Sequence, residues 1–231
     1  MGDSSARSPE PRATIKAVST PAVRHPIFAR FFDRLSQLME REAGEHRAEL
    51  LAGLSGRVIE VGAGNGMNFP HYPPGVQEVV AIEPEPYLRA KAERAARDSD
   101  VRVTVRDGVA DSLPLESGTF DAAVACLVLC SVPDLGPALA ELRRVLKPGG
   151  ELRFMEHVRA DSPTKARVQR WSDGSGLWPL LAGGCHCARD TVAAIRDAGF
   201  QVEQEEDFLL GPSWAITNPH VRGMARVAGE D

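Results

Sequence analysis

The segment Arg57–Tyr72, which reads RVIEVGAGNGMNFPHY, constrains the fold more than any other part of the chain. In it a short apolar run ends in three glycines at alternate positions, Gly62, Gly64 and Gly66. A strand that ends in a glycine turn lets backbone N–H groups approach a ligand closely, because glycine has no Cβ. An ordinary tight turn after a buried strand is the alternative, and the alternating glycines favour a ligand-binding loop.

The spacing of these glycines excludes two kinds of nucleotide-binding loop. A dinucleotide-binding loop follows the pattern G-x-G-x-x-G, and Met67 stands where its third glycine belongs. A phosphate-binding P-loop ends in Lys followed by Ser or Thr, and no such pair follows Gly66. The spacing therefore disfavours a nicotinamide-dependent oxidoreductase, which we keep only as an alternative.

Composition favours one domain preceded by a tail. Residues 1–21 are rich in Ser, Pro, Arg and Ala and predict a disordered, mildly basic tail, while 22–231 predict a single domain. Hydrophobic residues make up 43% of the chain, and its net charge of −5 does not suggest a nucleic-acid partner. No apolar run reaches the roughly 18 residues of a membrane span. Because no apolar signal peptide opens the sequence, we expect a cytoplasmic protein without disulfides.

Strand-like and helix-like segments alternate along the chain. This alternation predicts βαβ units and a parallel sheet. Right-handed crossovers place the carboxyl ends of parallel strands at one edge, where open α/β sheets bind ligands. The expected strands cover about 58–61, 78–82, 101–106, 120–129, 151–158, 200–210 and 221–228, and the expected helices cover 26–39, 44–52, 87–98, 135–146 and 191–198.

Chemically versatile side chains gather at this predicted edge. Glu83, about twenty residues after the glycine loop begins, can accept hydrogen bonds from both ribose hydroxyls of a nucleoside. A surface carboxylate is the alternative there. Asp107 could accept from an adenine amino group, and Val109 could line the ring. The segments that meet at the edge are 62–66, Glu83, Asp107, 126–131 and Glu156-His157.

The glycine loop resembles the cofactor loop of class I methyltransferases, which use S-adenosylmethionine. Further segments resemble the methyltransferase-like 7 family, whose members transfer methyl groups to alkyl thiols. Animal members of that family carry an apolar N-terminal membrane segment, and we expect none here. The resemblance covers about Pro26 to the C-terminus and rests on 126–132, 142–150, 156–158, Gly184-Cys185, 189–191 and 219–221.

The resemblance implies a Rossmann-like α/β fold with a seven-stranded, mostly parallel sheet whose last strand is antiparallel. It also implies an N-terminal helical cap over residues 22–55 and an acceptor lid over 159–188, after the fifth strand. S-adenosylmethionine is the implied cofactor, with Glu60 near its amino-acid end. We expect the cofactor to contact Glu60, Gly62, Ala63, Gly64, Gly66, Asn68, Glu83, Pro84, Asp107, Gly108, Val109, Cys126 and Leu127.

Three histidines are candidates for a catalytic base. His157 ends the fifth expected strand, although it could instead order Glu156 or a backbone carbonyl. His186 lies in the expected lid and could instead face solvent, and His220 is more consistent with a structural role. We expect the acceptor to be lined by Tyr72, Cys130, Trp171, Trp178 and Cys185, with packing as the alternative for the aromatic side chains.

The cysteines do not form a familiar metal motif. In Cys185-His186-Cys187 the spacing is poor for chelation, and the chain holds no second C-x-x-C pair. We therefore expect no metal, and we expect Cys130 to be a small buried residue.

The sequence thus predicts a methyltransferase that acts on a small-molecule acceptor, with a thiol as the first candidate. A thiol loses its proton near pH 8.5, so a modest base suffices for it. Methylation of oxygen, nitrogen or carbon in a quinone-like or natural-product acceptor is the second candidate. A non-catalytic module that binds S-adenosylmethionine is the third. The sequence sets no oligomeric state.

Overall fold

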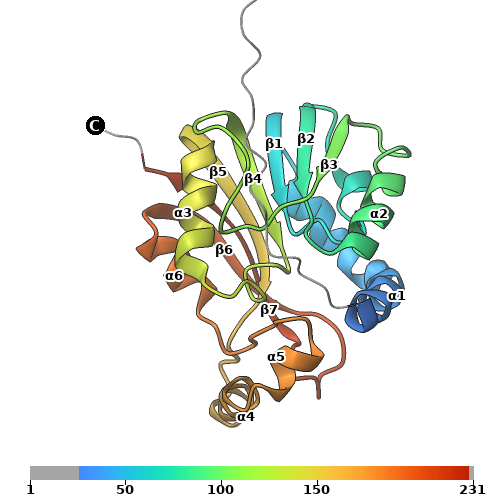
Figure 1. The fold of residues 1–231 in the computed structure, drawn as a ribbon. Helices are drawn as coiled ribbons and strands as arrows, with labels where there is room; N and C mark the ends of the chain where they lie inside the picture. The colour runs from blue at the N-terminus through green and yellow to red at the C-terminus, as the bar shows by residue number, and fades with distance from the viewer. Residues whose placement is uncertain (1–25, 229–231) are drawn as a thin grey trace, which may run out of the picture.

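The computed structural model describes residues 26–228, so the predicted tail (1–21) lies outside the described residues. One seven-stranded sheet in the order β3-β2-β1-β4-β5-β7-β6 forms its centre (Figure 1). β7 pairs antiparallel with both β5 and β6, whereas the other pairings are parallel. The predicted fold class is therefore confirmed. The strands are β1 Gly56–Val61, β2 Val76–Ile82, β3 Val103–Arg106, β4 Phe120–Cys126, β5 Leu146–His157, β6 Phe200–Leu209 and β7 Pro219–Val227.

Helices cover both faces of the sheet (Figure 1). Successive residues of a strand point to opposite faces, so Val58 and Ile59 of β1 enter different cores. Val58 packs with Leu51 of α1, and Ile59 packs with Leu142 of α3. Burial on both faces explains the nearly continuous apolar runs of the central strands. The helices are α1 Pro26–Leu51, α2 Pro86–Ala95, α3 Leu135–Val145, α4 Pro163–Gly174, α5 Leu177–Leu181 and α6 Thr191–Asp197, with a short 3-10 turn η1 at Phe69–His71.

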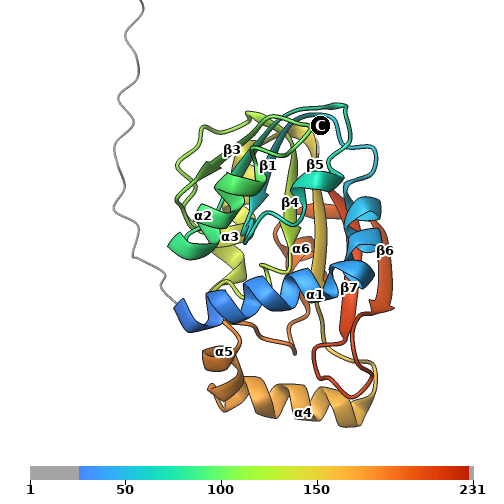
Figure 2. The ribbon, with the colours of Figure 1, turned by 90° about the vertical axis from the view of Figure 1, so that its right-hand side faces the viewer.

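The N-terminal cap is one helix, not the two predicted at 26–39 and 44–52. Gly44, taken as the start of a second helix, costs only about 1 kcal/mol inside a helix. Figure 2 shows α1 crossing the carboxyl ends of the strands, between the sheet and α4.

The face that α1 buries also differs from the prediction. Part of the apolar stripe at its start is exposed, with Ile27 87% and Leu38 79% exposed. The polar residues Asp33, Ser36 and Arg47 are buried. The buried side of α1 therefore combines these hydrogen-bonding groups with small and apolar residues, namely Ala29, Ala43, Leu50 and Leu51.

The turn after β4 replaces the end of a predicted strand. We expected the strand to continue to residue 129, but β4 ends at Cys126 because Leu127 has a left-handed φ of 58°. The fully buried carboxylate of Glu156 accepts from the backbone N–H groups of Val128, Leu129 and Cys130 at 3.1, 2.9 and 3.1 Å. These three groups would otherwise be unpaired in the interior. β3 begins at Val103, two residues later than predicted. β5 begins at Leu146, five residues earlier than predicted.

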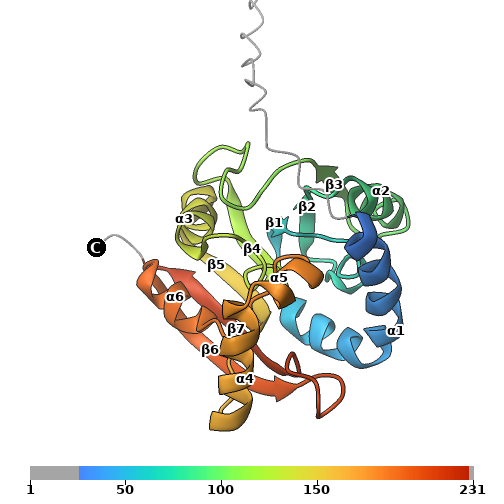
Figure 3. The ribbon, with the colours of Figure 1, turned by 60° about the horizontal axis from the view of Figure 1, so that its bottom comes forward.

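The segment 159–188, predicted as a lid, carries α4 and α5. Figure 3 looks toward the carboxyl ends of the strands and shows α5 over this end of the sheet, with α1 beside it. A Cβ added at Gly183 would lie 2.3 Å from the Phe28 ring, so lid and cap touch. Within residues 26–228, no helix has both the length and the apolar character needed to cross a membrane.

The Glu156 contacts predict a large loss of stability in Glu156→Ala. Each buried N–H group left unpaired costs about 1–3 kcal/mol, so we expect the free energy of unfolding to fall by at least about 3 kcal/mol. Urea unfolding measures this change. The control is Glu93→Ala on the exposed side of α2, which should stay within about 0.5 kcal/mol of wild type. A similar stability for both variants would contradict this role of Glu156.

Candidate active site

The glycine loop (residues 62–66) follows β1 in a conformation that needs glycine. Gly62 and Gly64 have φ values of 64° and 58°. A Cβ at Gly62 would lie 2.3 Å from Cγ2 of Val128, and one at Gly64 would lie 3.3 Å from the Phe32 ring. The amide of Asn65 donates to Asp33 at 3.0 Å, so α1 holds the loop from outside.

Glu83 ends β2 beside this loop, as predicted. Its Oε2 accepts from the backbone N–H of Gly64 at 2.7 Å, and its Oε1 accepts from that of Glu85 at 2.9 Å. Each carboxylate oxygen has a second lone pair, so both oxygens can still accept from ribose hydroxyls. Burial raises the pKa of Glu83 to about 7. These contacts fit a nucleoside held against the glycine loop.

Four predicted residues form a buried polar chain behind the loop. Glu60 accepts from Asn68 and from the Tyr72 hydroxyl, both at 2.8 Å, and burial raises the pKa of Glu60 to about 7. Arg47 donates to Asn68 Oδ1 at 2.7 Å and to Cys126 Sγ at 3.2 Å. Tyr72 is 6% exposed and packs in the core, so the structure places it behind the loop and not on an open acceptor surface.

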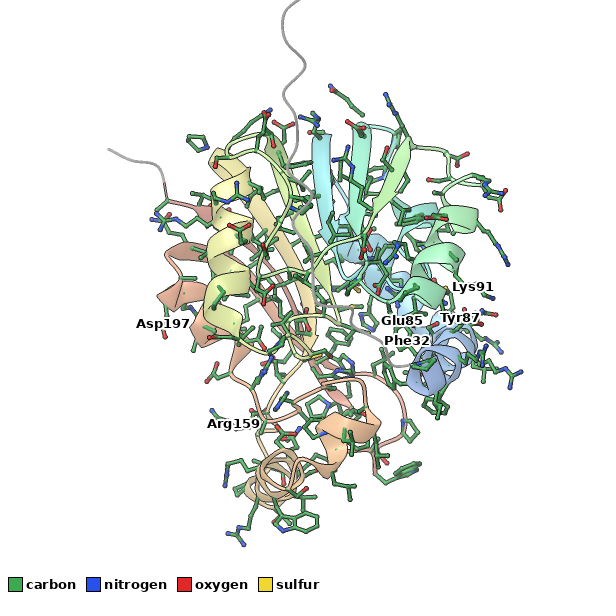
Figure 4. The ribbon with its side chains drawn as sticks, viewed as in Figure 1. Phe32, Glu85, Tyr87, Lys91, Arg159 and Asp197 are labelled. Carbon is green, nitrogen blue, oxygen red and sulfur yellow. The ribbon has the colours of Figure 1, made fainter. Side chains whose placement is uncertain are left out.

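Sequence reasoning missed the buried polar residues of α1 that support this site. Asp33 accepts from Asn65 and from Tyr87 at 3.0 Å each, and pairs with Lys91 at 3.0 Å. Figure 4 shows Tyr87 and Lys91 of α2 next to Phe32 of α1. Asp33 and Arg47 lie fourteen residues apart, which is close to four helical turns and puts them on one helix face. This helical spacing is the sequence signal that could have identified Asp33 and Arg47 as residues of one buried face.

On the predicted adenine side, Arg89 connects two strand ends. Its Nη1 donates to the carbonyls of Glu83 and Pro84 at 2.8 and 3.0 Å and to Asp107 Oδ1 at 2.9 Å. Gly108 after Asp107 is buried and Val109 is half-buried. Ala63, on the other side, donates its N–H to the carbonyl of Ile82 at 3.1 Å. The strand ends expected to hold the nucleoside are thus joined by direct hydrogen bonds.

The three candidate histidines differ in their hydrogen bonds. His157 Nδ1 lies 3.4 Å from Cys130 Sγ and 3.6 Å from Cys185 Sγ, and burial lowers the pKa of His157 to about 3. His186 Nδ1 lies 2.7 Å from the carbonyl of Gly184. A carbonyl only accepts, so Nδ1 of neutral His186 carries the proton and Nε2 keeps a lone pair. His220 is buried against the ring of His157.

The predicted acceptor residues divide into an inner and an outer group. Cys130 and Cys185 are buried and pack with Cys187 and with half-buried Trp178. Trp171 of α4 is 72% exposed. The structure brings the inner residues together at the carboxyl end of the sheet but leaves Trp171 apart from them.

Comparison with known proteins agrees with this architecture. Residues 59–154 match the family described as methyltransferase domain. A SAM-dependent methyltransferase of Thermotoga maritima, titled a possible histamine N-methyltransferase, superposes with a TM-score of 0.64 and 23% identity over 87% of this chain and 98% of that one. Fold and site define an S-adenosylmethionine-dependent class I methyltransferase, and S-adenosylmethionine is its methyl donor.

Two human relatives are similar over most of their length. Thiol S-methyltransferase TMT1A of Homo sapiens is 33% identical over 212 residues, which cover 86% of this chain and 85% of the relative. Thiol S-methyltransferase TMT1B of Homo sapiens is 34% identical over 182 residues, which cover 76% and 73%. The chain belongs to the family of these methyltransferases.

We predict that Glu83→Ala weakens binding of the cofactor product S-adenosylhomocysteine at least about 100-fold. Two hydrogen bonds to a charged carboxylate contribute about 1.5–3 kcal/mol each, and 1.4 kcal/mol corresponds to a tenfold change in affinity. Titration calorimetry measures the dissociation constant, with Glu93→Ala as the control that keeps wild-type affinity. Unchanged affinity in a folded Glu83→Ala protein would contradict the role of Glu83.

We also predict that affinity for S-adenosylhomocysteine depends on pH. The pKa of Glu83 is raised to about 7, and only its carboxylate form accepts from both hydroxyls. Affinity should therefore fall as the pH drops below about 7, by up to tenfold per unit, and level off above it. Glu83→Gln does not titrate, so its profile should be flatter. If affinity changed with pH in the same way in wild type and Glu83→Gln, the pH dependence would come from a group other than Glu83.

Proposed function

We propose that the protein transfers the methyl group of S-adenosylmethionine to the sulfur of a small-molecule thiol. The observation that carries this proposal is the similarity to two thiol S-methyltransferases at 33% and 34% identity over most of each chain. The sulfonium of the bound cofactor is the activated methyl donor. The protein then has to hold the nucleoside, exclude water and orient the acceptor, and orientation can contribute about 7–11 kcal/mol to the barrier reduction.

We assign cofactor binding to the glycine loop and Glu83, and acceptor binding to the space beneath the lid segment (residues 159–188). The cap helix α1 and the lid touch at Phe28 and Gly183, which supports an acceptor enclosed by both. The domain scheme of cap (22–55), core and lid within residues 22–231 is part of this proposal.

We assign proton removal from the acceptor to His186 in preference to His157. With Nδ1 directed at the carbonyl of Gly184, neutral His186 keeps an unshared pair on Nε2. The lowered pKa of His157, about 3, makes its ring a weak base. A thiol has an unperturbed pKa near 8.5, so its proton is removed more easily than that of a hydroxyl acceptor.

A paired acceptor panel tests the reaction. We expect methylation of alkyl thiols but not of phenols with the same carbon skeletons, followed by mass spectrometry of the products. His186→Gln should lower the rate most at pH values below the thiol pKa and least above it, because a thiol that is already ionised needs no base. Glu93→Ala serves as the unaffected control.

Two outcomes would contradict the proposal. Methylation of the phenols alone would favour the oxygen-acceptor alternative. Binding of S-adenosylhomocysteine by calorimetry without turnover of any acceptor would favour the non-catalytic module.

A further inference from the structure

Two thiols and an imidazole converge beneath the lid, and the proposed methyl transfer gives none of them a chemical role. Cys130 follows β4, His157 ends β5, and Cys185 lies in the lid after α5. Their Sγ and ring nitrogen atoms all lie within 4.8 Å of one another. All four cysteines among residues 26–228 are free. We had expected no metal because we considered only cysteines close in sequence, whereas this group joins three separate segments.

Two of the three ligand-to-ligand distances in this group match the edges of a tetrahedral zinc site. Zinc binds sulfur at about 2.3 Å and nitrogen at about 2.0–2.1 Å, so tetrahedral sulfur and nitrogen ligands lie about 3.5 Å apart. His157 Nδ1 lies 3.4 Å from Cys130 Sγ and 3.6 Å from Cys185 Sγ. Both thiols thus point at one ring nitrogen, which can share at most one proton with them.

Backbone contacts hold the lid cysteine against the sheet. The N–H of His186 donates to the carbonyl of Cys130 at 2.8 Å. Gly184 has a φ of 94°, and a Cβ there would lie 2.7 Å from the carbonyl oxygen of Ser131. Arg189, just after the lid, donates to the carbonyls of Leu129 and Val132 at 2.7 Å each. Backbone contacts before and after Cys185 therefore hold this cysteine next to Cys130.

A buried indole N–H also favours thiolates at this place. Nε1 of Trp178 is buried, and no hydrogen-bond partner for it exists among the residues that the structure describes. Trp178 packs directly against Cys130, Cys185 and Cys187. Metal-bound thiolates are stronger acceptors than thiols, so metal binding would turn a neighbouring thiol into the acceptor that this N–H lacks.

We propose that Cys130, His157 and Cys185 bind one zinc ion, or another thiophilic divalent cation, and so fasten the lid to the ends of β4 and β5. Two thiolates and one neutral imidazole form a recognised zinc donor set with one coordination position left for an exogenous ligand. Cys187 Sγ lies 3.9 Å from Cys185 Sγ but outside the group of mutually close ligand atoms. Binding converts the two thiols to thiolates and releases their two protons to solvent.

Cobalt substitution tests this site independently of methyl transfer. The full chain is reduced with a phosphine, stripped of metal with a chelator and titrated with Co²⁺. We expect one ion per chain, sulfur-to-cobalt charge-transfer absorption, ligand-field bands of tetrahedral intensity, and displacement of the cobalt by Zn²⁺. Zn²⁺ should also raise the melting temperature, because it binds the folded chain.

Single cysteine variants give the matched comparison. Cys130→Ser and Cys185→Ser each remove one of two thiolates and should lower the charge-transfer absorbance by about half. Cys126→Ser should leave the spectrum unchanged, because Cys126 lies next to Arg47 and outside the group. Circular dichroism confirms that each variant is folded.

The proposal is overturned if the reduced wild-type chain binds no Co²⁺ or Zn²⁺, a result that needs no variant to interpret. It is also overturned if Cys126→Ser alters the spectrum as much as Cys130→Ser does. Methylation of thiols by the metal-free protein together with absent metal binding would leave the proposed function standing and remove only this site.

Discussion

The carboxylate of Glu156 organises the carboxyl end of the sheet. β4 stops at Cys126, and the chain then turns through Leu127 with its N–H groups facing inward. The side-chain carboxyl group of Glu156, on the adjacent strand β5, accepts hydrogen bonds from three of those N–H groups. Burial raises its pKa to about 7, which reflects the cost of placing this group in the interior. Because buried N–H groups need partners, this cost is offset by the turn that Glu156 fixes.

The turn that Glu156 holds contacts both the glycine loop and the lid. On the cofactor side, Val128 occupies the volume above Gly62, so the glycine loop and the turn fit only in their present forms. On the lid side, the carbonyl of Cys130 receives the N–H of His186, and the carbonyl of Ser131 lies against Gly184. The glycine loop and the lid therefore both contact one element between β4 and α3, the turn that Glu156 holds.

Much of the fold could be predicted from the sequence because its signals are local or periodic. The alternating glycines after Val61 and the apolar run of β4 correctly indicated a mostly parallel sheet, and the ligand sites at its edge stay a prediction. The position of Glu83 beside the glycine loop could be predicted because strand ends in such sheets have a fixed place relative to that loop. The single turn at Leu127 was missed, since a leucine with positive φ carries no sequence signature and depends on Glu156 twenty-nine residues later.

Two features could be recognised only in the structure: the buried polar residues of α1, and the group formed by Cys130, His157 and Cys185. α1 buries Asp33 and Arg47 and leaves Ile27 exposed, which apolar periodicity does not predict. Tertiary hydrogen bonds to Asn65 and Asn68 decide this orientation, and they join residues far apart in sequence. Likewise, Cys130 and Cys185 meet only because the lid returns to the end of β4. Contacts between residues so far apart in the sequence produce no motif with a recognisable spacing.

Native-state hydrogen exchange of the backbone amides of Val128, Leu129 and Cys130 tests this account most directly. These amides lie outside every helix and strand, yet each donates to the buried carboxylate of Glu156. The account predicts that they exchange as slowly as the amides of β4, through global unfolding only. Exchange at the rate of exposed loop amides would contradict it, because the turn would then be free to open while the sheet remains folded.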